Sequence, residues 1–157
     1  MNIREKYILE VKIKHMNPLI KLIKEDNLDF IRIAKQSKFT KDAPYLAKKW
    51  NSGILEGLFD EDKMLGFMWY NISKRKNYVK LYYVAIDIEL RNKGYGRIMM
   101  DRLFEISKKS GLSKLTFLVS KENPAIDFYK KFNPSSIEEK DKDYIVGYNL
   151  GKKLCIK

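Results

Sequence analysis

The chain has 157 residues, and its 45% hydrophobic and 33% charged content is typical of a folded globular protein with its own core. No apolar run approaches the roughly 20 residues that a membrane-spanning helix needs, and residues 1–6 are not followed by the apolar segment of a signal peptide. We therefore expect one domain over residues 1–157, no membrane partner and a cytoplasmic location.

The rare residue types and the net charge narrow the chemistry further. Cys155 is the only cysteine and His15 the only histidine, which excludes an internal disulfide and a cysteine-based zinc site and disfavours histidine catalysis. We expect no bound metal. The 32 lysines and arginines against 20 acidic residues give a net charge of +12, which fits either a phosphate-bearing partner or a solvated lysine-rich surface.

The first half of the chain predicts a strand, a set of helices and then three strands. Period-two alternation predicts a strand over residues 7–14, and Asn17-Pro18 resembles a helix start, predicting a short helix to about residue 24. Helical patterns follow at residues 28–36 and 43–50. Three strands joined by polar turns are then expected at residues 54–59, 64–72 and 78–88. The third is apolar on both alternations, which predicts a central strand.

The second half begins with an amphipathic helix. Tyr95, Met99, Leu103 and Ile106 recur at helical spacing, and Gly111 ends the pattern. A strand over residues 114–120, a short helix opened by Asn123-Pro124, a polar loop over residues 133–143 and a last strand over residues 144–150 are expected to follow. Counting the first two helical patterns and leaving out the weaker one at residues 43–50, the order is β-α-α-β-β-β-α-β-α-β, which predicts an α/β domain with a mixed sheet.

The strongest candidate binding segment is Arg91-Asn92-Lys93-Gly94-Tyr95-Gly96-Arg97, between a buried strand and an amphipathic helix. In that context backbone N–H groups and the helix N-terminus can hold phosphate, and two glycines let the backbone approach an anion closely. By itself the motif is weak, because a tight turn with a few surface cations explains it as well. It is neither a Rossmann loop, since Met99 stands where a third glycine is required, nor a P-loop.

An RNA-binding pattern is a more serious competitor for the same segment. Lys93-Gly94-Tyr95-Gly96 matches the first four places of the RNP1 motif. The match then fails, because Arg97 and Met100 stand where stacking aromatic residues are required and the segment enters a helix instead of a strand. A nucleic-acid-binding module is therefore the weakest alternative.

The same segment resembles the GNAT (GCN5-related N-acetyltransferase) superfamily, whose acetyl-CoA signature is Arg/Gln-x-x-Gly-x-Gly/Ala between its fourth strand and third helix. Residues 91–96 match this signature, and Asn123-Pro124-Ala125-Ile126-Asp127-Phe128-Tyr129 loosely meets a second family pattern, Asn-x-x-Ala-x-x-Phe-Tyr. With the element order, the resemblance covers nearly the whole chain. It implies a single-domain α/β GNAT (acyl-CoA N-acyltransferase) fold, whose mixed, mostly antiparallel sheet carries helices on both faces.

The resemblance also implies an activity and a role for each matched residue. It implies an N-acetyltransferase that moves acetyl from acetyl-CoA to a primary amine by direct transfer in a ternary complex. The CoA pyrophosphate would be held by Arg91, Asn92, Lys93, Gly94, Tyr95, Gly96 and Arg97. Main-chain groups of Ile86 and Ile88 would pair with the pantetheine arm where the fourth and fifth strands separate, and Asn123 would touch the same arm. Tyr129 would give a proton to the leaving thiolate.

The general base and the acceptor amine are not indicated. The glutamates that two subfamilies of such proteins carry on the fourth or fifth strand are missing from residues 78–81 and 117–119. Glu56 and Tyr83 are candidates, although an ordinary structural role is favoured for each. An α-amine of pKa about 8 is about one-tenth neutral at pH 7 and would need no base. The missing base favours one alternative, a noncatalytic CoA-sensing or partner-binding domain on the same fold.

Two further features leave partners open. Phe30, Phe39, Tyr45 and Trp50 lie in the region that usually shapes the acceptor site, where helix packing is the favoured explanation for them. Family members are often dimers, so a homodimer is compatible with the resemblance, but no segment indicates an oligomer interface.

Overall fold

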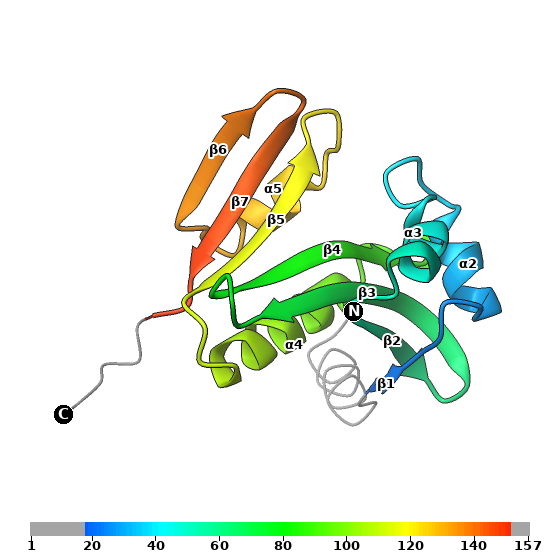
Figure 1. Cartoon of the computed structure of the whole chain (residues 1–157). Helices are drawn as coiled ribbons and strands as arrows, with labels where there is room; N and C mark the ends of the chain where they lie inside the picture. Colours follow the sequence, from blue (N-terminus) through cyan, green and yellow to red (C-terminus); the bar gives the residue numbers. More distant parts are fainter. Residues whose placement is uncertain (1–17, 152–157) are drawn as a thin grey trace, which may run out of the picture.

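The structure, a computed structural model, describes residues 18–151 (Figure 1). The strand expected over residues 7–14, His15 and Cys155 lie outside this range. No helix within residues 18–151 is long and apolar enough to cross a membrane.

Within residues 18–151, seven strands form a central sheet in the order β1-β2-β3-β4-β5-β7-β6. The strands are β1 (Leu19–Leu22), β2 (Ile54–Asp60), β3 (Lys63–Ser73), β4 (Tyr78–Ile86), β5 (Lys114–Ser120), β6 (Ser136–Lys140) and β7 (Asp143–Asn149). Among the strands of the described residues, only β4 and β5 run parallel, and all other neighbours are antiparallel. The sheet is therefore mixed and mostly antiparallel, as expected, and β4 lies at its centre.

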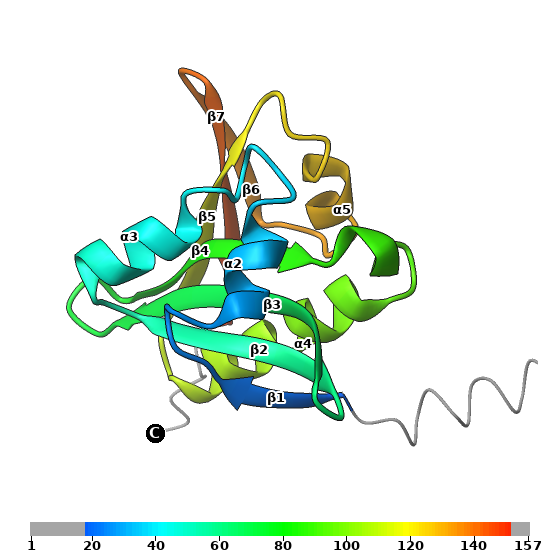
Figure 2. The same ribbon diagram turned by 90° about the vertical axis from the view of Figure 1, so that its right-hand side faces the viewer.

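Helices cover both faces of the sheet (Figure 2). On one face α2 (Leu28–Ala34) and α3 (Ala43–Trp50) enclose a small core in which the rings of Phe30 and Phe67 meet edge to face at 4.6 Å. On the other face α4 (Tyr95–Lys109) and α5 (Ile126–Lys130) cover a larger core that includes Met68, Leu103 and Leu115. A short 3-10 helix, η1 (Ile88–Leu90), follows β4.

The structure corrects two expected elements, and both are edge strands. Residues 19–22 form β1, not a helix, and pair with β2 from Leu19 opposite Phe59 to Leu22 opposite Glu56. A helix of about seven residues would carry the full cost of nucleation, whereas the edge of β2 offers hydrogen bonds directly. Residues 136–140, expected in a loop, form β6 in a hairpin with β7. Its sequence, Ser-Ile-Glu-Glu-Lys, lacks strand character because most of β6 is exposed to solvent.

The parallel pair β4 and β5 separates soon after it starts. They pair only over Tyr78–Lys80 of β4, and beyond that point β5, β7 and β6 diverge from β4 together (Figure 1). From Leu81 to Ile86, one edge of β4 therefore has no strand beside it among the described residues. The Asp87 N–H donates to the Leu65 carbonyl on β3. Successive peptide groups of a strand point alternately to its two edges, so those of Val84 and Ile86 face the open edge.

Candidate active site

A cleft of about 650 Å³ lies beside the open end of β4. Its walls come from the end of β4, the loop into α4, the first turn of α4, and α5. The cleft brings together the predicted site residues except Ile88 and Lys93: Ile86, Arg91, Asn92, Gly94, Tyr95, Gly96, Arg97, Asn123 and Tyr129 all line it. Segments predicted separately along the sequence thus meet in one cavity.

The loop before α4 turns through two residues in the left-handed region, Asn92 with φ 63° and Gly94 with φ 90°. Gly94 is the N-cap, and the N–H of Ile98 donates to its carbonyl at 3.2 Å. The N–H groups of the first turn, which begins at Tyr95, precede that bond and have no partner within the helix. No acidic residue lies in that turn. This end of a 15-residue helix is therefore suited to an anion.

The two glycines of the loop are required for different reasons. A Cβ at Gly94 would meet nothing within 4 Å, so its positive φ alone favours glycine. A Cβ at Gly96 would lie 3.2 Å from Cζ of Phe128, because α4 and α5 approach closely there. A longer side chain at position 96 must therefore displace Phe128 or enter the cleft.

Three cations line the cleft. The Arg91 side chain lies over the end of β4, where its Nε donates to the Ile86 carbonyl at 3.3 Å. The Arg97 guanidinium lies 5.7 Å from the ring centroid of Phe132. Lys131, at the end of α5, also lines the cavity, and no acidic side chain of the described residues does so. Lys131 was missed by the sequence analysis because its lysine-rich surroundings give it no distinguishing signal.

Ile88 does not take the position that was expected for it. It begins η1, its side chain is exposed, and its N–H donates to Oε1 of Gln36 at 2.9 Å. Val84 lines the cleft instead, one alternation earlier on β4. Counting back by two from a strand that ends at Ile86 would have found it.

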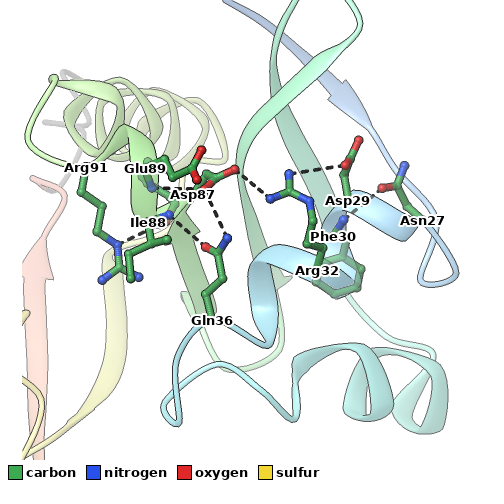
Figure 3. Close-up of polar contacts among 10 residues, drawn as sticks. Asn27, Asp29, Phe30, Arg32, Gln36, Asp87, Ile88, Glu89 and Arg91 are labelled. Carbon is green, nitrogen blue, oxygen red and sulfur yellow. Dashed lines mark hydrogen bonds and ion pairs between the residues drawn. The ribbon is translucent and has the colours of Figure 1, made fainter.

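A buried carboxylate fixes the end of β4 to α2 (Figure 3). Asp87 is 4% exposed and accepts hydrogen bonds from Nη1 of Arg32 at 2.9 Å and Nε2 of Gln36 at 3.2 Å. It also accepts from the Glu89 N–H at 3.2 Å. Burial alone would raise the pKa of Asp87, but the bonds from Arg32, Glu89 and Gln36 hold it below the usual value. The network thereby positions the strand end from which the chain continues into the loop before α4.

Tyr129 lies on α5 with its ring packed against Phe117 and Phe128, at centroid distances of 4.6 and 5.3 Å. Its main-chain carbonyl accepts a hydrogen bond from the Tyr148 hydroxyl at 2.9 Å. The Tyr129 hydroxyl makes no hydrogen bond among the described residues, and it is not one of their fully enclosed unpaired polar atoms, so it is reached from the cleft. Burial, with a smaller effect from Tyr148, raises the pKa of Tyr129 well above its ordinary value. The cleft therefore contains a fixed, protonated phenol whose hydroxyl is free to meet a ligand.

Glu56 lies in the core and does not line the cleft. It accepts a short hydrogen bond from the Tyr70 hydroxyl, and its Oε2 lies 3.6 Å from Nε of Arg102 on α4. Tyr83 does not line the cleft either, but it lines an adjoining hollow, with its ring stacked on Trp69 at 5.9 Å. Burial, followed by the charge of Asp42, raises the pKa of Tyr83, so its phenol stays protonated. Neither residue therefore has the position and ionisation that a general base needs.

A second hollow of about 330 Å³ adjoins the cleft and shares five lining residues with it, Phe39, Thr40, Val84, Asn123 and Tyr129. The aromatic residues that were expected to pack the helices divide between two roles. Phe30 is fully buried, as expected, and Tyr45 is exposed. Phe39 and Trp50 line the hollows, which is the less favoured of the two expected roles, and Trp50 also packs against Trp69.

Comparison with known proteins identifies the family. The model described as the Acetyltransferase (GNAT) family matches residues 19–133. The chain belongs to this family. The match confirms the resemblance that residues 91–96 and 123–129 indicate.

One curated relative is an uncharacterized N-acetyltransferase, YuaI, of Bacillus subtilis (strain 168), 28% identical over 109 residues. The match covers 65% of this chain and 62% of the relative, so the chain spans less than two thirds of that protein's length.

Solved structures share the GNAT fold at low sequence identity. The ribosomal-protein-S18-alanine N-acetyltransferase of Escherichia coli has a TM-score of 0.68 at 19% identity, covering 87% of this chain and 97% of that one. A PaiA N-acetyltransferase of Thermoplasma acidophilum in complex with coenzyme A has a TM-score of 0.65 at 18% identity, covering 85% of this chain and 99% of that one.

Within residues 18–151, no group of three or more His, Cys, Asp or Glu side chains could hold a metal ion.

Proposed function

We propose that this protein is an N-acetyltransferase that transfers the acetyl group of acetyl-CoA to a primary amine by direct attack in a ternary complex. One observation carries the proposal: an anion-binding helix end, an unpaired strand edge and a protonated phenol meet in a single cleft. These groups suit, in that order, the pyrophosphate, the amide-bearing pantetheine arm and the thioester sulfur.

Acetyl-CoA would supply the acyl group and a thiolate leaving group. The first turn of α4, with Arg91, Arg97 and Lys131, would hold the phosphates. The peptide groups of Val84 and Ile86 would pair with the pantetheine arm as an added strand. A backbone N–H on this edge would also stabilise the oxyanion that forms when the amine nitrogen attacks the carbonyl carbon.

Tyr129 would complete the transfer. As the new C–N bond forms and the C–S bond breaks, the Tyr129 hydroxyl donates its proton to the departing sulfur, and the amide nitrogen releases its extra proton to solvent. A phenol of pKa about 10 giving its proton to a thiolate whose acid has pKa about 8.5 costs about 2 kcal/mol in water. Burial that raises the pKa of Tyr129 raises that of the thiol in the same dry cleft, so the difference is largely preserved.

No carboxylate of the described residues lines the main cleft, so none there can take the proton of the amine, which must be lost to water. A primary alkyl amine such as that of lysine, with a pKa of about 10.4, is almost entirely protonated at pH 7, so the rate should rise with pH. The same observation favours the second candidate function, a noncatalytic acetyl-CoA sensor. A sensor would bind acetyl-CoA and acetylate no amine in a broad panel.

Thermal-shift titration with acetyl-CoA tests the proposal. At 100 times the Kd, acetyl-CoA should stabilise the protein by about 2.7 kcal/mol, or about 5 to 10 °C. Gly94→Val should abolish this shift. Gly111→Val is the matched control, because Gly111 lies just after α4 with φ 74° and equally open space around its Cβ position. Both variants should lose similar stability, about 1 to 2 kcal/mol from strain.

Two outcomes would contradict the proposal. An unchanged acetyl-CoA shift in Gly94→Val would remove the phosphate-binding role of the loop. A salt-sensitive shift with a short RNA, without one for acetyl-CoA, would identify the cleft as a nucleic-acid contact.

A further inference from the structure

The second hollow begins where the first cleft ends, at Tyr129. Because Val84, Asn123 and Tyr129 line both, a molecule in the hollow lies next to the group proposed to protonate the leaving sulfur. At about 330 Å³, the hollow is at the lower end of the range for ligand pockets, about 300 to 1,000 Å³. It therefore suits a small molecule more than an extended polymer.

Aromatic rings form one wall of the hollow. The Trp50 ring lies 5.8 Å from that of Tyr82, and Tyr82 lies 4.7 Å from Trp69. Trp69 is 1% exposed and its Nε1 donates to the Ser52 carbonyl at 2.8 Å, so it fixes the base of this wall. Trp50, at the end of α3, remains 48% exposed although it packs on Trp69 at 5.5 Å. An exposed tryptophan on a rigid aromatic support offers a free ring face to a ligand.

The charges around the hollow limit what it can accept. Among the described residues that line it, only Lys80 and Asp143 are charged, one of each sign. Lys80 Nζ lies 5.5 Å from the Tyr82 ring centroid, directly beside the aromatic wall. A polyamine would bring several ammonium groups close to Lys80 with only Asp143 to pair with them, whereas a monoamine brings one ammonium group, which that carboxylate or an aromatic ring face can hold.

We propose that this hollow is the acceptor subsite and that its occupant is a small primary monoamine with a flat aromatic body, an arylalkylamine. This inference rests on the proposed acetyltransferase function. The aromatic body would stack against Trp50 and Tyr82, and the amine would point toward Tyr129 at the junction with the cleft. Such a molecule satisfies the size, the aromatic wall and the charge balance together.

Initial rates at saturating acetyl-CoA test the assignment, with 2-phenylethylamine and tryptamine compared with spermidine. We expect kcat/KM for the aromatic amines to exceed that for spermidine at least tenfold. Trp50→Ala should lower kcat/KM for 2-phenylethylamine about three- to tenfold, the loss of one aromatic contact, and leave KM for acetyl-CoA unchanged. Tyr45→Ala is the matched control, because Tyr45 is an exposed aromatic residue of α3 that does not line the hollow.

Calorimetric titration of 2-phenylethylamine into the CoA-saturated protein separates the subsite from the chemistry. Binding that Trp50→Ala weakens, without turnover of any amine, supports the subsite and overturns the transferase. Turnover that favours spermidine, or equal rates for the Trp50→Ala and Tyr45→Ala variants, overturns the subsite and leaves the transferase intact. The subsite is also overturned if aromatic amines neither bind nor react.

Discussion

Replacing Tyr129 by phenylalanine removes one hydroxyl and leaves the ring that packs against Phe117 and Phe128. Because that hydroxyl has no hydrogen-bond partner among the described residues, its removal should not lower the free energy of unfolding. The rate should respond very differently. A general acid contributes about 10²- to 10⁴-fold, and water can replace part of that, so kcat should fall at least tenfold, or about 1.4 kcal/mol.

The assay measures CoA release at saturating acetyl-CoA and amine, together with the melting temperature and the acetyl-CoA shift. Tyr148→Phe is the control, since it removes a hydroxyl that donates to the Tyr129 carbonyl at 2.9 Å. It should cost about 0.5 to 1.5 kcal/mol of stability, the loss of one hydrogen bond, because the Tyr129 carbonyl still accepts from the Phe132 N–H at 3.1 Å. The loss of rate should be much smaller than for Tyr129→Phe. A wild-type rate for Tyr129→Phe, with acetyl-CoA binding retained, would refute the acid role.

Three further results are expected. Asp87→Asn should lower the free energy of unfolding by about 1 to 3 kcal/mol at pH 7, as measured by urea unfolding. Because the fold lowers the pKa of Asp87, its carboxylate stabilises the native state above the ordinary pKa of about 4. The difference in stability between wild type and variant should therefore become smaller below that pH. With an amine acceptor, kcat/KM should rise with pH to a plateau and show no decline up to about pH 10, because the raised pKa of Tyr129 keeps it protonated; a falling limb near pH 8 would contradict this. Glu56→Gln should lower the melting temperature by weakening its contacts with Tyr70 and Arg102, yet keep this pH profile, whereas a lost ascending limb would restore Glu56 as the base.

The elements that sequence predicted well are those whose signals are local. The bounds expected for α3 are those observed, and α4 begins at Tyr95 as its apolar spacing indicates. The strands β1 and β6 were missed because each depends on a neighbouring strand for its hydrogen bonds. In β6, alternation is also hidden by solvent exposure on most positions.

The site residues that could be predicted are likewise those with a local signal, and the others depend on contacts between distant segments. The turn at Asn92 and Gly94 uses residues that tolerate positive φ, so the turn before α4, which we propose binds phosphate, could be predicted from its own sequence. The choice between Ile88 and Val84 depends on where β4 ends, which Asp87 determines through contacts with α2. The same holds for Trp50, whose place beside Tyr82 joins segments far apart in the chain.

The open edge of β4 has a consequence for how much of the protein is folded. A ligand that pairs with Val84 and Ile86 adds hydrogen bonds to the central strand of the sheet, not to a peripheral loop. Under the proposed function, each tenfold rise in acetyl-CoA above its Kd would stabilise the native state by about 1.4 kcal/mol. The population of folded molecules, and their resistance to proteolysis, would then follow the cell's supply of its acyl donor.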